Sequence, residues 1–291
     1  MTTHSQKKVR AKHPGWLGRL LAMVPVTCVL LYPFYLAGQL DTVENVRFFA
    51  QLPAAFDGLR IVYLSDIHFG TYFKEARVRA LVERVNALEP DLIILGGDYA
   101  EDSDTAIDFF ALRPEFRAKY AVIGVLGNHD RTPPESNLPL LEAEMRAANV
   151  TPLINQTLTL EKDGFRLALA GIDDYYNGHP DLDAVAADCR SADFAIFLPH
   201  TPDVMPLVSA MPGGPFCQMA LCGHTHGGQI ALFGHAIKSS SDYGDRYLSG
   251  WYQESGVEMM VSNGVGTSFL PLRMGARPQI HLITLRSGEK K

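Results

Sequence analysis

Short apolar segments followed at once by polar side chains constrain this chain more than any other feature. Three such segments, at 59–64, 92–95 and 120–126, are rich in Ile, Leu and Val, as strands buried on both faces of an α/β sheet are. The polar residues that follow them are Asp66, His68, Asp98, Asn128, His129 and Asp130. An aspartate after a strand is often only a turn or capping residue. Three such loops in succession indicate a ligand site at the carboxyl ends of the strands.

The rest of the body continues the α/β pattern. Apolar residues at helical spacing predict a helix over 74–88, and an Asp163-Gly164 turn predicts a hairpin over 157–170. Further strands are expected at 194–198, 229–233 and 258–262, with an edge or closing strand at 278–285. We therefore predict one α/β domain over 41–291.

A second polar cluster follows the apolar run 219–221. It contains His224 and His226, whose i, i+2 spacing places both imidazoles on one side of an extended backbone. The flanking glycines allow close approach to a bound group. Alone this spacing is weak, because many histidines bind no metal. His200 follows strand 194–198 and so occupies the same kind of position as Asp98.

Together the strand ends supply more ligands than one tetrahedral metal site can use. The candidate metal ligands are Asp66, His68, Asp98, Asn128, His200, His224 and His226. Carboxylate, imidazole and amide donors without thiolate suit borderline metals. We therefore expect two divalent ions, drawn from Mn, Fe and Zn.

The same residues carry a family resemblance. D-x-H at 66–68, G-D at 97–98, G-N-H-D at 127–130, His200 and G-H-x-H at 223–226 resemble the motif blocks of the calcineurin-like metallophosphoesterases. The resemblance implies a four-layer α/β/β/α sandwich of the metallophosphoesterase type with a two-metal centre. It implies one metal held by Asp66, His68 and His226, another held by Asn128, His200 and His224, and Asp98 bridging both.

Two metals about 4 Å apart can clamp a phosphoryl group and generate a bridging hydroxide as the nucleophile. The resemblance makes His129 the catalytic residue beside the leaving group, where it can donate a hydrogen bond or proton. Asp130 either orients His129 or caps a helix. Arg273 and Arg277 either bind a second phosphate or form surface salt bridges.

Segments 64–68, 223–230 and 264–278 look like a membrane-associated bacterial branch that is similar to UDP-2,3-diacylglucosamine hydrolases. We therefore predict a phosphodiesterase or pyrophosphatase acting on a lipid-linked substrate such as UDP-2,3-diacylglucosamine. The alternatives are a general phosphoesterase without lipid preference and a non-catalytic, membrane-anchored scaffold on the same fold. Intact ligand positions disfavour the scaffold.

The N-terminal part of the chain differs from the body. Residues 20–40 contain no charge, and about 20 helical residues span roughly 30 Å, so a transmembrane helix or signal anchor is expected there. A cleaved signal peptide is the alternative. The basic segment 1–19 predicts a single-pass protein of the bacterial inner (cell) membrane with a cytoplasmic N-terminus and the catalytic domain outside. A UDP-sugar substrate, which is cytoplasmic, conflicts with that orientation.

Charge and cysteines exclude two further classes. The formal net charge of −6 includes +5 on residues 1–40, which leaves −11 on the body and argues against nucleic-acid binding. The four cysteines form no C-x-x-C pair, so a disulfide framework is not expected, although a Cys217–Cys222 bridge stays open.

Overall fold

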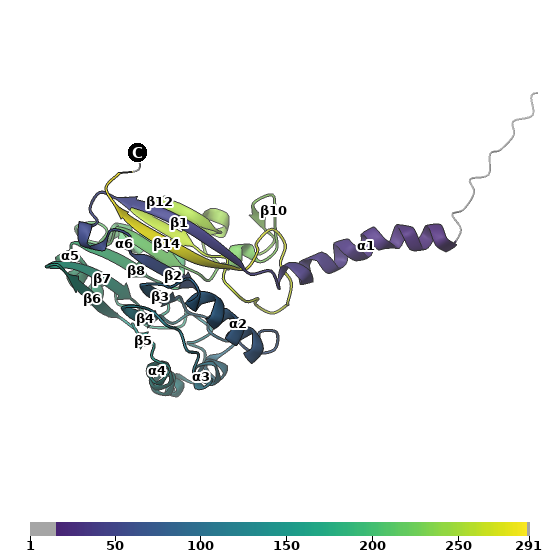
Figure 1. Cartoon of the computed structure of the whole chain (residues 1–291), viewed down its shortest axis with the longest axis horizontal. Coiled ribbons are helices and arrows are strands. Elements are labelled where there is room, and N and C mark those ends of the chain that lie inside the picture. Colours follow the sequence, from purple (N-terminus) through teal and green to yellow (C-terminus); the bar gives the residue numbers. More distant parts are fainter. Residues whose placement is uncertain (1–15, 290–291) are drawn as a thin grey trace, which may run out of the picture.

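Two mixed six-stranded sheets make up the body of the protein (Figure 1). The computed structural model describes residues 16–289. The first sheet contains, in spatial order, β1 Asp41–Phe49, β14 Gln279–Ser287, β2 Arg60–Leu64, β3 Leu92–Leu95, β4 Ala121–Gly124 and β5 Thr151–Pro152. The second contains β12 Gly250–Glu254, β13 Val257–Val261, β9 Met219–Cys222, β8 Phe194–Leu198, β7 Phe165–Gly171 and β6 Gln156–Lys162.

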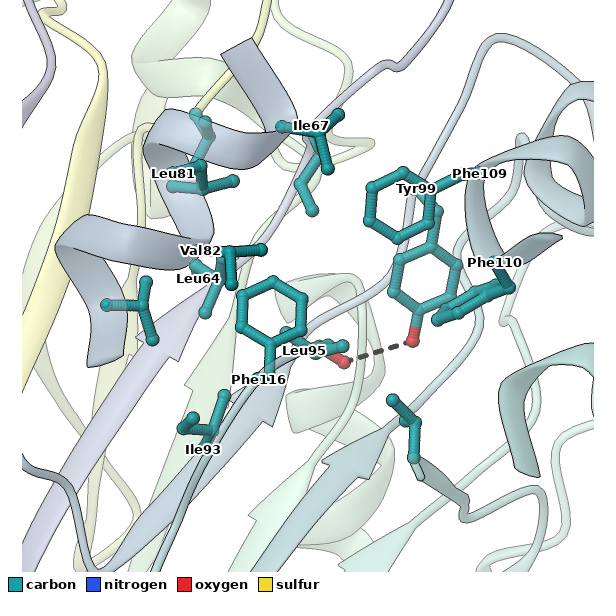
Figure 2. Close-up of a cluster of buried hydrophobic side chains, with 14 of the residues drawn as sticks. Leu64, Ile67, Leu81, Val82, Ile93, Leu95, Tyr99, Phe109, Phe110 and Phe116 are labelled. Carbon is teal, nitrogen blue, oxygen red and sulfur yellow. Dashed lines mark hydrogen bonds between the residues drawn. The ribbon is translucent and has the colours of Figure 1, made fainter. Parts of the chain in front are cut away.

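Helices cover the outer faces of both sheets. They are α2 Glu75–Asn86, α3 Ser103–Ala111 and α4 Leu138–Ala147 on the first sheet, and α5 Leu182–Ser191 and α6 Met205–Ala210 on the second. Figure 2 shows the cluster under α2 and α3, where Val82 of α2 lies beside Leu64 of β2. In the same cluster Phe110 packs against Tyr99 with ring centroids 4.7 Å apart. The predicted four-layer α/β/β/α arrangement is confirmed.

The alternating side chains of β2 explain its uninterrupted apolar sequence. Ile61 and Tyr63 pack in the core between the two sheets, whereas Val62 and Leu64 pack under the helices. All four are fully buried. Burying each apolar side chain contributes about 1.5–3 kcal/mol, so both faces of the strand stabilise the fold.

Parallel strands in both sheets bring their carboxyl ends to common edges. The first sheet has β2, β3 and β4 parallel and adjacent, and the second has β7, β8 and β9 in the same relation. Loops that are distant in sequence therefore leave the sheets side by side.

Several predicted elements form as expected. The helix predicted over 74–88 is α2, and the strands predicted at 194–198 and 258–262 are β8 and β13. The predicted hairpin is the β6–β7 pair, whose turn residues Asp163 and Gly164 both have positive φ, at 53° and 82°. Positive φ at both central residues is the geometry that a tight hairpin turn requires.

Two strand predictions are wrong in part. Of 229–233, only Ala231–Leu232 forms a strand, β10, which pairs with β11 His235–Ala236 outside both large sheets. Left-handed backbone at Gly228 and Gln229 interrupts the extended chain before it. The C-terminal strand is not an edge strand, because β14 lies between β1 and β2. The edge is β1, which was not predicted.

The N-terminal helix, α1 Trp16–Leu36, projects from the body (Figure 1). Within residues 16–289, no helix combines the length and the apolar character needed to cross a membrane. The membrane-spanning helix predicted over 20–40 is therefore not supported. The helix ends at Leu36 because Ala37 and Gly38 turn the chain toward β1, with Leu36 and Ala37 buried against the body. Most of the basic segment 1–19 lies outside the described residues.

The cysteines carry no cross-link. Cys28, Cys189, Cys217 and Cys222 are all free thiols, and the last three are buried. The Cys217–Cys222 bridge that the sequence left open does not form.

Candidate metal centre

Loops after three adjacent strands of the first sheet carry four predicted ligands to one edge. Asp66 and His68 follow β2, Asp98 follows β3 and Asn128 follows β4. The backbone nitrogen of Asp66 donates to the Gly97 carbonyl at 2.9 Å, and that of His68 donates to the Asp98 carbonyl at 3.2 Å. These bonds continue the strand pairing into the loops and fix the side chains relative to one another.

The second sheet supplies the remaining three ligands. His200 follows β8, and His224 and His226 follow β9. The backbone nitrogen of His224 donates to Oδ1 of Asp66 at 2.9 Å, so a direct hydrogen bond joins the two sheets at the site. The structure therefore brings all seven predicted ligands to one edge of the sandwich.

Backbone strain is concentrated at this edge. Five of the seven residues have left-handed φ values: Asp66 53°, His68 47°, Asp98 53°, His224 69° and His226 53°. Such conformations cost about 1 kcal/mol or more for residues with side chains, and they cluster at functional sites. The strain turns the side chains toward a common centre at the cost of local stability.

Asp66, His68 and His226 form one group of buried donors. The Nε2 atoms of His68 and His226 lie 3.0 Å apart, and Nε2 of His226 lies 3.6 Å from Oδ1 of Asp66. One ligand atom from each of the three residues lies within 4.8 Å of the others. Two imidazole nitrogens and a carboxylate oxygen make a donor set suited to a borderline divalent ion.

Asp98, His200, His224 and Asn128 form the adjoining group. Oδ2 of Asp98 lies 3.2 Å from Nε2 of His200 and 3.8 Å from Nε2 of His68, so this carboxylate stands between the two groups. Nδ1 of His224 lies 2.8 Å from Oδ1 of Asn128. Because a carboxylate has two oxygens, Asp98 is able to serve both groups.

Outer hydrogen bonds orient two of these imidazoles. Nδ1 of His200 contacts the Gly96 carbonyl at 2.8 Å, and Nε2 of His224 contacts the Ser240 carbonyl at 3.1 Å. Because a carbonyl only accepts, each of these nitrogens carries the proton. The other nitrogen of each ring then faces the centre, which is the usual arrangement behind a metal-ligating histidine.

The electrostatics keep three of the four imidazoles neutral; burial alone would lower the pKa of His200, but the adjacent Asp98 carboxylate raises it well above its ordinary value. Burial lowers the pKa of His68 to about 3 and that of His224 to about 4, and it holds the pKa of His226 well below its ordinary value. Burial alone would raise the pKa of Asp98, but the adjacent His200 holds it well below its ordinary value. Neutral imidazoles and an ionised carboxylate are the forms that bind metals.

These residues fit two divalent cations. Nε2 of His200 faces Oδ2 of Asp98 at 3.2 Å, and Nδ1 of His224 and Oδ1 of Asn128 point at each other. Converging nitrogen and oxygen lone pairs of this kind call for an electrophile between them. The division of ligands between two ions follows the two donor groups, although each residue's role stays a prediction.

His129 borders the centre but is not among the seven predicted metal ligands. Its backbone nitrogen donates to Oδ1 of Asp98 at 2.9 Å, and its Nδ1 donates to the Glu101 carbonyl at 2.8 Å. The imidazole is half-buried and lines the pocket above the centre. Its Nε2 is thereby left available to a bound group.

Asp130 neither orients His129 nor caps a helix. Its carboxylate accepts hydrogen bonds from the backbone nitrogens of Asp98, Tyr99 and Gly127, at 2.7, 2.9 and 2.9 Å. It therefore ties the loop after β3 to the loop after β4. Sequence reasoning missed this role, because the partners are backbone groups brought together by strand pairing.

Neither Arg273 nor Arg277 is placed to bind phosphate. Arg273 is fully buried and hydrogen-bonded to backbone carbonyls, and Arg277 forms a partly exposed ion pair with Asp41, 3.1 Å apart. The sequence alternative of a surface salt bridge is therefore confirmed for Arg277 but not for Arg273. Nothing in the sequence signals the burial of Arg273.

A pocket of about 360 Å³ opens above the centre. Asp98, Asn128, His129, His224 and His226 contribute to its floor and walls. The remaining wall carries apolar side chains and a cation: Ile230, Ile237, Phe269 and Lys238. Among the described residues lining it, Lys238 is the only lysine or arginine. Ile230 and Phe269 fall within the segments 223–230 and 264–278 that carry the finer resemblance, whereas no motif marked Ile237 and Lys238.

Comparison with known proteins agrees with this geometry. Residues 59–228 match the calcineurin-like phosphoesterase family, a range that contains all seven candidate ligands and His129. YkuE of Bacillus subtilis, described as an uncharacterized metallophosphoesterase, is 33% identical over 253 residues, covering 85% of this chain and 86% of that protein. The phosphodiesterase YaeI of Escherichia coli is 28% identical over 248 residues, covering 83% and 86%.

A cattle relative is longer. The transmembrane protein with metallophosphoesterase domain of Bos taurus is 29% identical over 284 residues, which cover 92% of this chain but 62% of that protein.

Proposed function

From the premise that this chain belongs to the calcineurin-like phosphoesterase family and is a metal-dependent phosphoester hydrolase, we propose that its substrate is a lipid-linked phosphodiester or pyrophosphate. The observation that carries the proposal is the composition of the pocket. Metal-type donors form its floor, and Ile230, Ile237 and Phe269 line its wall. UDP-2,3-diacylglucosamine is a substrate of this class. The resemblance of segments 64–68, 223–230 and 264–278 to UDP-2,3-diacylglucosamine hydrolases supports this choice of substrate.

The metal ligands are assigned by donor group. Asp66, His68 and His226 would hold one divalent ion, Asn128, His200 and His224 the other, and Asp98 both. When bound, the two ions supply Lewis-acid activation of water and neutralise charge on the phosphoryl group. The identity of the ions, Mn, Fe or Zn, is to be settled by add-back after chelation.

The chain's own residues act on the substrate from the walls of the pocket. Lys238 makes no hydrogen bond or ion pair with another described residue, so its ammonium is free to attract an anionic phosphoester. His129 is placed to donate a hydrogen bond or proton to the leaving oxygen from Nε2, while the Glu101 carbonyl fixes Nδ1. Ile237 and Phe269 exclude water from an acyl chain seated against them.

The role of His129 predicts a dependence on the leaving group. We expect His129→Gln to lower kcat by about 10²- to 10⁴-fold for a diester with an alkyl leaving group. The loss should be much smaller with nitrophenolate, because a good leaving group needs little help from a proton donor. Steady-state kinetics on the two substrates measures the difference.

His179→Gln serves as the control, since that side chain is 82% exposed and outside the site. Equal losses of His129→Gln on both substrates would contradict the leaving-group role.

The lipid preference predicts a selective effect at Phe269, which is 85% exposed. We expect Phe269→Ser to lower kcat/KM for an acylated substrate by about 10- to 100-fold, because the lost apolar burial is worth roughly 1.5–3 kcal/mol. Hydrolysis of a short, soluble diester should not change. Phe165→Ser is the matched control, because Phe165 is an exposed phenylalanine at the β6–β7 turn.

The direct test compares substrates on the full chain in detergent, with Mn added after chelation. Preferred cleavage of UDP-2,3-diacylglucosamine over a simple diester and a monoester would support the lipid-linked substrate. Activity confined to the simple esters would instead make the protein a general phosphoesterase. The location at the bacterial cell membrane also stays a proposal, to be tested by fractionation of cells.

A further inference from the structure

Arg273 is the largest fully buried side chain of the described protein, with none of its surface exposed. It lies in the irregular segment between β13 and β14. Its Nε donates to the carbonyl oxygen of Gly266 at 3.0 Å. Its Nη1 donates to the carbonyl oxygens of His226 and Ala276, each at 3.2 Å. Nη2 also lies 3.2 Å from Nδ1 of the His226 ring.

The charge of Arg273 is costly in this position. Burial lowers its pKa to about 9, which still leaves it protonated at neutral pH. In the described residues, no carboxylate lies within ion-pair distance of the guanidinium, so its direct polar partners are mainly backbone carbonyls, and the Asp66 carboxylate acts on the charge only from a greater distance. Burying an ion without a partner costs several kcal/mol. Such a cost points to a structural task that an apolar side chain would not perform.

The contacts of Arg273 identify that task. His226 is held in the left-handed region at φ 53°, and Gly227 after it has φ 61°. Arg273 donates to the backbone carbonyl of His226, while its other bonds anchor the turn to Gly266 and Ala276. The unfavourable turn is thereby clamped to a separate loop.

We propose that Arg273 is a positioning residue that holds His226 in place and so completes the Asp66, His68 and His226 half of the metal centre. This inference rests on the proposed two-metal function. The adjoining half depends on other contacts, since the Gly96 and Ser240 carbonyls orient His200 and His224. Loss of Arg273 should therefore empty one half and spare the other.

The first experiment counts metal ions in the full-length protein. After chelation, each protein is equilibrated with Mn²⁺, freed of excess, and measured by elemental analysis and by electron paramagnetic resonance. We expect two Mn per chain in the wild type and one in Arg273→Met, which has no donors. Arg277→Met is the matched control from the same loop and should keep two, because Arg277 pairs only with Asp41 at the surface.

Arg273→Lys separates hydrogen bonding from charge. Lysine keeps the charge but lacks the planar fork that reaches three carbonyls at once. We expect the weaker Mn site of this variant to lose affinity by about 10- to 100-fold, as happens when outer-shell partners are lost. Thermal unfolding shows whether Arg273→Met folds. If it does not, Arg273→Lys still allows the inference to be tested.

A double variant tests whether Arg273 acts through His226. If it does, His226→Ala and His226→Ala/Arg273→Lys should bind the remaining Mn with the same affinity. A further loss in the double variant, or two Mn bound with wild-type affinity in Arg273→Met and Arg273→Lys, would overturn the inference. A wild type that binds fewer than two Mn would instead contradict the two-metal function itself.

Discussion

Asp98→Asn is expected to lower kcat/KM for any phosphodiester substrate by about a thousandfold or more, whatever the leaving group. Oδ2 of Asp98 lies 3.2 Å from Nε2 of His200 and 3.8 Å from Nε2 of His68, between the two donor groups. Its replacement by a neutral amide removes a charged ligand from both groups. For comparison, loss of a residue that only hydrogen-bonds to a metal ligand typically lowers metal affinity or activity by about 10- to 100-fold.

Asparagine preserves the shape of the side chain and keeps an oxygen for the backbone nitrogen of His129, which now lies 2.9 Å from Oδ1 of Asp98. The fold should therefore survive, as thermal unfolding will report. Asp108→Asn is the matched control, since Asp108 is an exposed aspartate on α3. The measurement is turnover after reconstitution with a defined amount of Mn. Undiminished turnover by Asp98→Asn would remove the basis for a two-metal mechanism.

Removal of bound metal is expected to abolish hydrolysis almost completely and to lower the thermal unfolding midpoint. The centre collects two carboxylates and four imidazoles in a largely buried site, where the nitrogens of His68 and His226 approach to 3.0 Å. Ions that bind only the folded state stabilise it by about 2.7 kcal/mol at a free concentration 100 times the Kd. Chelated protein should regain activity and thermal stability together when Mn²⁺ is returned.

The control for metal removal is Asp98→Asn carried through the same chelation and add-back. Because that variant lacks the shared ligand, its unfolding midpoint should respond less to Mn²⁺ than that of the wild type. Full activity in wild-type protein that elemental analysis finds free of metal would contradict the prediction. Such a result would mean that the seven candidate ligands serve only the structure of the protein, and that the nucleophile is generated without a metal ion.

Much of the site could be predicted from the sequence because its residues follow buried strands directly. The apolar runs that became β2, β3, β4, β8 and β9 are local patterns, and each placed its polar residues at a carboxyl end. The structure brings Asp66, Asp98 and His200 together at that edge as expected. Their assignment to particular metals depends on the resemblance and stays a prediction.

The predictions that failed concern segments whose partners are distant in the chain. The terminal strand at 278–285 alternates like an edge strand, yet β1 covers its outer side through pairs such as Asp41 with Gln279. No local pattern reveals that 41–49 returns to meet the last strand. Likewise, 229–233 has strand composition, but left-handed backbone at Gly228 and Gln229 prevents a long extended run.

The sequence by itself determined the elements of the body and the chemistry of their ends, because the spacing of apolar residues and the chemistry of side chains are local properties. The tertiary structure alone decided the rest. It buried Arg273 beside His226, turned Asp130 onto three backbone nitrogens and surrounded the pocket with Lys238, Ile237 and Phe269. Those roles arise from loops that meet only after folding, and the free energy that holds them together comes from contacts between distant residues.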